Sequence, residues 1–295
     1  MNLTDEENWF EKNVEKVHVH GKNILAKLKN YSKLKNTQKK ELEELVIPSY
    51  KEWKLNNEKL KGYTDSIIEE RVKFLNSYKK KIKDVTFSSQ SKFHSSVIEE
   101  FLYYLFKDLI YNLNSQNQKD YKAKIVLGRA RAYTNLYFAP KNLLSFLKNP
   151  NMKVNVKDQD FAIYREIQIK ADDESEVINV PVVSMECKTY IDKTMLEGSI
   201  ATAEKIKNGN PYCLFLIVTE WYDVSYDVDP AYSRIDQIYV LRKQKRKVKK
   251  QKRKAISDKE IDFKVIIDLF NFVKKHLERG WSNIDKKIKK EGKII

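Results

Sequence analysis

The sequence predicts an α/β (α+β) fold, in which a mixed central sheet is flanked by helices and preceded by a helical N-terminal subdomain. Three observations support this prediction. Helical periodicity prevails up to about residue 85, and two β-like runs separated by a polar turn follow from residue 161. A continuous apolar run at residues 212–219 is typical of a strand that is buried on both faces.

Residues 1–87 are expected to form the helical subdomain. Apolar residues such as Ile68, Val72 and Leu75 recur on one helical face, and lysines crowd the opposite face. His18 and His20 alternate with valines, so a strand or a loop explains them as well as a metal-binding pair does. The chain has four histidines, which are too few and too scattered to indicate a zinc site.

Residues 88–295 are expected to form the second domain. Its first element is a strongly apolar helix from residue 96 to about residue 112, and a short apolar helix is expected at residues 143–147. An antiparallel hairpin is then predicted from two runs rich in Val, Ile, Tyr and Phe, with the polar segment 171–176 as its turn. The elements expected after the hairpin are a helix at 193–207, strands at 212–219 and 235–241, and a helix at 263–277.

The charge of the chain indicates a polyanionic partner. Lys and Arg number 57 against 41 Asp and Glu, a net charge of +16, and ten of the cations lie in residues 242–254. Nucleic acid is the natural partner for such a chain, although a solubilising loop or a patch that meets an acidic membrane surface would look similar. The sequence contains no run of about 18 apolar residues, so it does not predict a membrane span. The N-terminus does not resemble a secretory signal.

The two cysteines give a further indication of compartment. Cys187 and Cys213 lie within apolar runs and are expected to be buried free thiols. A reducing cytoplasm suits such residues, and they offer no disulfide framework.

The predicted hairpin brings three charged residues together. If its turn is centred near residues 173–174, paired positions sum to about 347, which puts Asp160 opposite Cys187 to within one residue. Glu186 and Lys188 are two residues apart on one strand and therefore share a face. We thus expect Asp160, Glu186 and Lys188 to converge at one end of the hairpin.

This constellation has a chemical interpretation. Two carboxylates, from Asp160 and Glu186, and the backbone carbonyl of Cys187 form a hard oxygen site suited to Mg²⁺. Lys188 is placed to orient a water molecule and to offset negative charge in phosphodiester hydrolysis. Glu99 lies on the shoulder of the apolar stripe of its helix and is a candidate ligand of a second metal or a water, whereas Glu100 is expected to point away. A structural cross-strand ion pair would show the same short motif.

Asp160 and the segment Glu186-Cys187-Lys188 resemble the PD-(D/E)XK nuclease signature, and the αβββαβ order is similar to the core of that superfamily. The stretch 183–196, with the helix SSVIEEFLYYLF before it, resembles type II restriction endonucleases, in particular the subfamily that cuts CCTNAGC-like or CTNAG-like sites. The resemblance spans roughly residues 90–245, and Gln159 stands where the signature often has proline.

The resemblance implies roles for the residues of the motif. Asp160 and Glu186 would bind Mg²⁺, Lys188 would be catalytic, and Glu99 would be the acidic residue of the helix. The enzyme would cut double-stranded DNA at a specific short sequence and leave 5′-phosphate and 3′-hydroxyl ends. It would act in the prokaryotic cytoplasm beside a cognate DNA methyltransferase. Some members of the subfamily work as two different subunits, so a homodimer and a heterodimer both remain open.

DNA recognition is less well defined by the sequence. The candidate DNA-binding residues are donors able to contact bases or phosphates, namely Arg129, Arg131, Tyr133, Asn135 and Arg234. The basic segment 242–254 is expected to contact only the DNA backbone. Three other functions remain compatible with the pattern: a DNA repair or recombination nuclease, a ribonuclease, and a non-catalytic DNA-binding protein.

Overall fold

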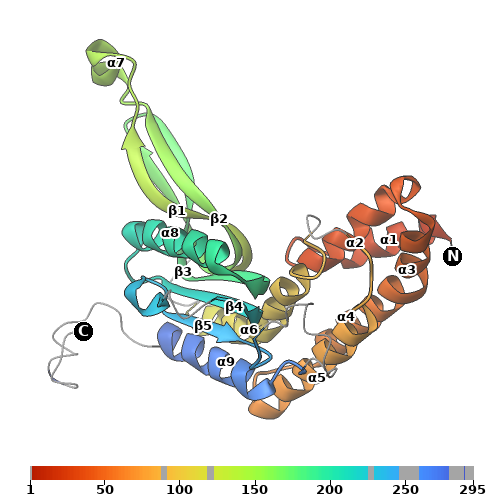
Figure 1. Ribbon diagram of the computed structural model, residues 1–295. Helices are drawn as coiled ribbons and strands as arrows, with labels where there is room; N and C mark the ends of the chain where they lie inside the picture. The colour runs from red at the N-terminus through yellow and green to blue at the C-terminus, as the bar shows by residue number, and fades with distance from the viewer. Residues whose placement is uncertain are drawn as a thin grey trace.

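The N-terminal region is helical, as the sequence predicts. The computed structural model describes residues 2–87, 92–117, 123–224, 229–245, 259–278 and 289. The N-terminal helices are α1 (Leu3–Asn13), α2 (Val19–Lys29), α3 (Asn36–Glu41), α4 (Ile47–Lys59) and α5 (Asp65–Lys81), with a 3₁₀ turn η1 (Tyr31–Lys33) and a π-helical segment η2 (Leu42–Val46). They form the red-to-orange part of Figure 1.

His20 has a structural role in the N-terminal region. His20 lies in α2, so the expectation of a strand or loop there is wrong. Its two ring nitrogens contact the Tyr78 hydroxyl at 2.6 Å and the Ser96 hydroxyl at 2.9 Å, and the side chain is fully buried. Since both nitrogens are occupied by hydrogen bonds, His20 has no free lone pair for a metal.

A five-stranded mixed sheet follows, in agreement with the predicted fold class. Its strands lie in the order β1-β2-β3-β4-β5, with antiparallel pairing from β1 to β3 and parallel pairing from β3 to β5. The bounds are β1 (Ile125–Phe138), β2 (Met152–Ala171), β3 (Glu174–Ile191), β4 (Leu214–Tyr222) and β5 (Gln237–Val240). The predicted hairpin is β2–β3, whose tight turn consists of Asp172 and Asp173.

Helices cover both faces of the sheet. α8 (Lys193–Gly209) lies on one face, and α6 (Ser96–Asn117) and α9 (Phe263–Glu278) lie on the other (Figure 1). α8 ends at Gly209, two residues beyond the predicted end at residue 207, and α9 and the buried strand β4 lie close to their expected positions.

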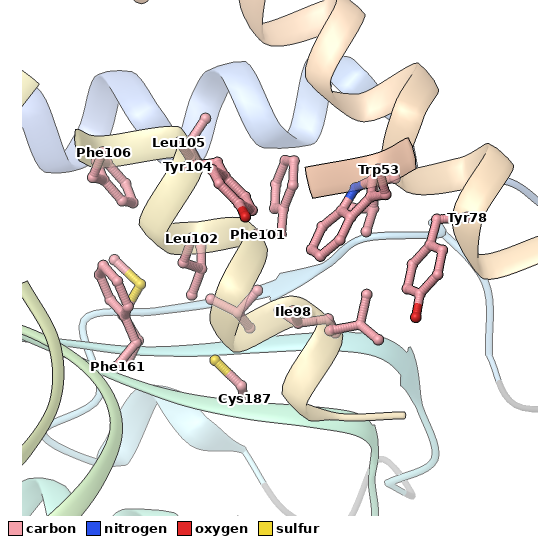
Figure 2. Packing of buried hydrophobic residues seen from close by; sticks show 14 of the residues in the cluster. Trp53, Tyr78, Ile98, Phe101, Leu102, Tyr104, Leu105, Phe106, Phe161 and Cys187 are labelled. Carbon is pink, nitrogen blue, oxygen red and sulfur yellow. The ribbon is translucent and has the colours of Figure 1, made fainter. Parts of the chain in front are cut away.

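α6 is the central element of the fold. One hydrophobic cluster contains α6 together with residues of the N-terminal helices, the sheet and α9. Figure 2 shows Phe161 and Cys187 of the sheet on one side of α6, and Trp53 and Tyr78 of the N-terminal helices on the other. The division of the chain near residue 88 stays a prediction, because this core is continuous across it.

Burial of α6 on both sides overturns the expectation for Glu100. The sequence suggests that this residue points away from the core, but it is 0% exposed. Its carboxylate accepts hydrogen bonds from the Gly21 amide (2.9 Å) and from the hydroxyls of Tyr50 (2.9 Å) and Tyr104 (3.1 Å). The prediction failed because the N-terminal helices cover the side of α6 that would otherwise face water.

Strands β1 and β2 extend beyond the body of the protein as a ribbon, the β1–β2 arm (residues 131–157), which carries α7 (Leu143–Lys148) at its far end (Figure 1). α7 lies where the sequence predicts a short helix, whereas no strand was predicted for residues 125–138. Three leucines of α7 are 71–72% exposed (Leu143, Leu144 and Leu147). Periodicity therefore identified a helix, although no described part of the chain buries it.

A buried ionic network links the sheet to the N-terminal helices and to the start of the basic segment. Glu220, at the C-terminal end of β4, contacts Lys79 of α5 at 2.6 Å and the Arg242 guanidinium at 2.6 and 2.8 Å. Arg242 is thus a structural residue, whereas residues 246–254 of the predicted basic segment lie outside the described residues. Both cysteines are free and buried, which confirms that prediction. In the described part of the chain, no helix is long and apolar enough to cross a membrane.

The close approach of α8 to β1 predicts a stability difference between two glycines of α8. A Cβ at Gly209 would lie 2.4 Å from the carbonyl oxygen of Thr134, whereas a Cβ at Gly198 meets nothing within 4 Å. Gly209→Ala should lower the free energy of unfolding by about 1–3 kcal/mol through overpacking. Gly198→Ala should raise it by up to about 1 kcal/mol through helix propensity. Urea denaturation of both variants measures the difference, and equal effects would contradict the contact.

The environment of Glu100 predicts a pH-dependent stability. Burial raises the pKa of this carboxyl from 4.5 to about 7, although its three hydrogen bonds oppose the shift. Between these values the unfolded chain loses the proton while the folded chain keeps it, so stability from this group is lost as the pH rises. Glu100→Gln should therefore gain stability relative to the wild type from about pH 4.5 to 7. Denaturant titrations at several pH values test this, with the exposed Glu197→Gln as a control that should show no such trend.

Candidate active site

The β2–β3 hairpin brings Asp160 beside Glu186 and Lys188. Phe161 pairs with Met185, so the antiparallel register continues to Asp160 opposite Glu186, one residue from the predicted partner. The Cys187 amide donates a hydrogen bond of 3.0 Å to Asp160 Oδ2. This bond fixes the aspartate against the second strand.

Lys188 bridges the two carboxylates. Its Nζ lies 3.3 Å from Asp160 Oδ2 and 3.4 Å from Glu186 Oε2. Burial alone would lower the pKa of Lys188, but the charges of Asp160 and Glu186 outweigh it and the pKa is raised. Lys188 is therefore a firmly protonated cation between two acids.

Glu186 is held by α8. Asp192 caps this helix by accepting a hydrogen bond from the Met195 amide, which fixes where the first turn begins. Ser199, two turns into α8, donates a hydrogen bond of 2.7 Å to Glu186 Oε2. Sequence reasoning missed Ser199, because only the packing of α8 on the sheet brings it to β3.

α6 brings Glu99 to the same region. Glu99 is 1% exposed, and its Oε2 accepts a hydrogen bond of 2.8 Å from Arg129 Nε and forms an ion pair of 2.7 Å with the same guanidinium. Its Oε1 is buried and has no hydrogen-bond partner among the described residues. Burial raises the pKa of Glu99, the Arg129 hydrogen bond opposes the rise without cancelling it, and the nearby charge of Asp160 adds to it.

Two further residues, Lys92 and Gln159, lie beside Asp160, and neither was predicted from the sequence as a site residue. Lys92 Nζ lies 3.6 Å from Asp160 Oδ1, on the side away from Lys188. Gln159, which stands where the resembled signature often has proline, is buried and accepts a hydrogen bond of 2.5 Å from Ser184. Gln159 thus ties β2 to β3 directly beside Asp160.

The described residues show no group of three or more His, Cys, Asp or Glu side chains able to hold a metal ion. They nevertheless fit the ligand set that Mg²⁺ takes, because this ion commonly uses one or two carboxylates and completes its shell with water and phosphate oxygens. Asp160 and Glu186 supply two carboxylates on adjacent strands, and the buried Oε1 of Glu99 is an acceptor without a donor.

The Cys187 side chain has no part in this chemistry. It points into the core on the α6 side of the sheet (Figure 2). Burial raises the pKa of its thiol well above the usual value, and the charges of Asp160 and Glu99 add to the effect. A neutral, enclosed thiol is neither a nucleophile nor a metal ligand.

The matched region of the chain decides its family. The sequence model of the Bpu10I restriction endonuclease matches residues 90–285, about two thirds of the protein. The chain belongs to the Bpu10I restriction endonuclease family. The match contains every residue of the candidate site, from Lys92 to Ser199.

A solved structure has the same fold as this Bpu10I-family protein. It is described as the native BbvCI A2B2 tetramer at low resolution, and its TM-score is 0.65 at 21% sequence identity. The similarity covers 91% of this chain and 99% of that chain, so it includes the N-terminal helices as well as the sheet. No curated protein sequence matches the chain.

The candidate DNA-binding residues of this Bpu10I-family chain occupy different places. Arg129 pairs with Glu99 of α6 at the candidate site, and Arg131, Tyr133 and Asn135 lie further along β1. The register shift at Thr134 turns Asn135 to the side of α8. Arg234 lies at the C-terminal end of α8, where it contacts Glu204 at 3.1 Å and Asn208 at 2.8 Å. The structure therefore gathers four of these residues on β1 and leaves Arg234 on the α8 side.

The burial of both thiols predicts their reactivity in the Bpu10I-family protein. The pKa values of Cys187 and Cys213 are raised by burial, so the reactive thiolate is scarce and enclosed. A colorimetric thiol reagent at neutral pH should detect no fast-reacting thiol in the folded protein and two thiols after denaturation. Rapid modification of Cys187 in the folded protein would contradict the placement of its side chain.

Proposed function

We propose that this protein is a Mg²⁺-dependent type II restriction endonuclease of the PD-(D/E)XK class. It hydrolyses double-stranded DNA at a specific short sequence and leaves 5′-phosphate ends. The observation that carries the proposal is the juxtaposition of Asp160 and Glu186 on adjacent strands with Lys188 between them. Membership of a restriction endonuclease family supports it independently.

Asp160, Glu186 and the backbone carbonyl of Cys187 would hold the metal. When bound, Mg²⁺ polarises the phosphoryl group and lowers the pKa of a coordinated water. Glu99, which presents an unpaired buried oxygen, is the candidate for a further ligand of a metal or a water. Glu100 does not share this role, because the N-terminal helices enclose it.

The remaining residues of the site position these groups and balance their charge. The Cys187 amide orients Asp160, and Ser199 orients Glu186. Lys188 keeps its proton at neutral pH, so it acts as a fixed cation that offsets the negative charge of the transition state and orients the attacking water. Lys92 adds a second cation beside Asp160 and favours the approach of a phosphate.

Cutting both strands of DNA requires two such centres, so we expect the protein to act with a second nuclease subunit, either identical or related. A cognate DNA methyltransferase is the expected companion that protects the host genome. The basic segment 242–254 would contact the DNA backbone without reading sequence.

The direct test is digestion of supercoiled plasmid with and without Mg²⁺, followed by sequencing of the ends. Discrete Mg²⁺-dependent fragments with 5′-phosphates are expected, and nicked circles alone would indicate one half of a heterodimer. A smear would favour a repair nuclease, and no cutting in any divalent metal would favour a DNA-binding protein.

Lys188→Ala tests the assigned chemistry. Loss of the fixed cation should reduce the cleavage rate at least about 100-fold, because one preorganised electrostatic group commonly contributes this much. DNA affinity, measured by fluorescence anisotropy without divalent metal, should stay within about threefold of the wild type, since this cation lies between two carboxylates. Lys170→Ala, an exposed lysine near the turn of the same hairpin, is the matched control and should cut normally. Undiminished cleavage by Lys188→Ala would refute the mechanism.

A further inference from the structure

The β1–β2 arm carries a net positive charge, although an acid of β3, Glu174, accepts a hydrogen bond of 2.6 Å from the Met152 amide of the arm. Residues 131–157 contain five cations and no Asp or Glu, although carboxylates make up 41 of the 295 residues of the chain. The arm projects from the body (Figure 1) and continues directly from the strands that carry Arg129 and Asp160. Such a surface attracts a polyanion and repels a second copy of itself.

One face of the arm presents amides and lysines together. Asn135 and Asn155 are direct cross-strand partners, and both are exposed. Lys153 and Lys157 lie two residues to either side of Asn155, so they share its face of the strand. The order along β2 is therefore lysine, amide, lysine, with a second amide opposite the first.

A β-bulge joins this face to α8. The register of β1 against β2 shifts between Tyr133 and Asn135, and the extra residue, Thr134, packs its carbonyl against Gly209. The resulting depression has a volume of about 480 Å³, and its lining contains no carboxylate: Thr134, Asn135, Asn155, Val156, Lys157, Lys205 and Asn208. Glu204, the neighbouring acid on α8, is neutralised by Arg234.

We propose that this face is the sequence-reading surface of the enzyme, with the β1–β2 arm lying in the major groove of DNA. The major groove admits a two-stranded β-ribbon, and an asparagine amide forms paired hydrogen bonds with the edge of adenine. Asn135 and Asn155 read base edges, while Lys157 and Lys205 hold the flanking phosphates. The inference rests on the proposed function in taking double-stranded DNA as the ligand.

The length of β2 limits where the contacts fall. Asn155 and Asp160 are five residues apart on one strand, a distance of at most about 17 Å at the rise of a β-strand. Base pairs are stacked about 3.4 Å apart. With the reach of the two side chains added, the bases read by Asn155 lie within about one helical turn, roughly 10 base pairs, of the phosphodiester that is cut.

The test separates reading from cutting. Asn135→Ala, Asn155→Ala, Lys157→Ala and Lys205→Ala are made in the full-length protein that also carries Lys188→Ala. Each variant selects from a library of randomised DNA duplexes without divalent metal, and the bound duplexes are sequenced. Asn36→Ala and Lys33→Ala, exposed residues of the N-terminal helical region, serve as matched controls. Thermal melting verifies folding, and analytical ultracentrifugation gives the oligomeric state.

Two distinct results are expected. The asparagine variants should lose about 10- to 100-fold in discrimination at one or two base pairs near the cut, with little change at the others. The lysine variants should bind all sequences more weakly and reduce the slope of affinity against salt by about one each.

Three results would overturn the inference. One is unchanged discrimination in both asparagine variants, and another is an affected base pair more than one helical turn of DNA from the cut. The third is a change of oligomeric state without a change of sequence preference, which would assign the arm face to a subunit contact. Sequence-selective binding by a wild-type protein that cuts nothing would refute the proposed function and leave this inference standing.

Discussion

The burial of α6 between the sheet and the N-terminal helices is the constraint on which the rest of the structure depends. Each Leu or Phe that this helix buries contributes about 1.5–3 kcal/mol, and its apolar residues contact both neighbours at once. Because no face of its first turns is left to water, the two consecutive acids there are both enclosed. Glu99 is turned toward the candidate active site, and Glu100 toward the N-terminal hydrogen-bond network.

Buried ion pairs also lie where the sheet meets the helices that pack against it. Glu220 is held by one cation from α5 and another from the beginning of the basic segment, so the sheet, the N-terminal helices and that segment meet at a single carboxylate. Removal of one partner from such a network commonly costs about 3–5 kcal/mol, because a charge is left buried without compensation. These contacts make the relative placement of the layers specific, whereas apolar packing alone would tolerate sliding.

The sequence predicted best where a short-range pattern decides the structure. The alternation of residues in β2 and β3 and the polar turn between them were enough to place Asp160 within one residue of its observed register. The same method missed β1, because arginines and tyrosines on its exposed face suggested a recognition segment rather than a strand. The positions of Lys92, Ser199 and Glu100 could not be predicted, because each depends on which element packs over it.

The continuity of strand β2 limits how the DNA sequence specificity of a restriction endonuclease with this fold could change. The same strand carries the arm face and Asp160, so the spacing between the proposed reading surface and the candidate active site is fixed by covalent structure. Inserting one residue between them would reverse the facing of every side chain beyond it. On this view, new specificities within this scaffold arise by exchanging side chains at fixed positions, and the offset of the cut from the bases read is inherited unchanged.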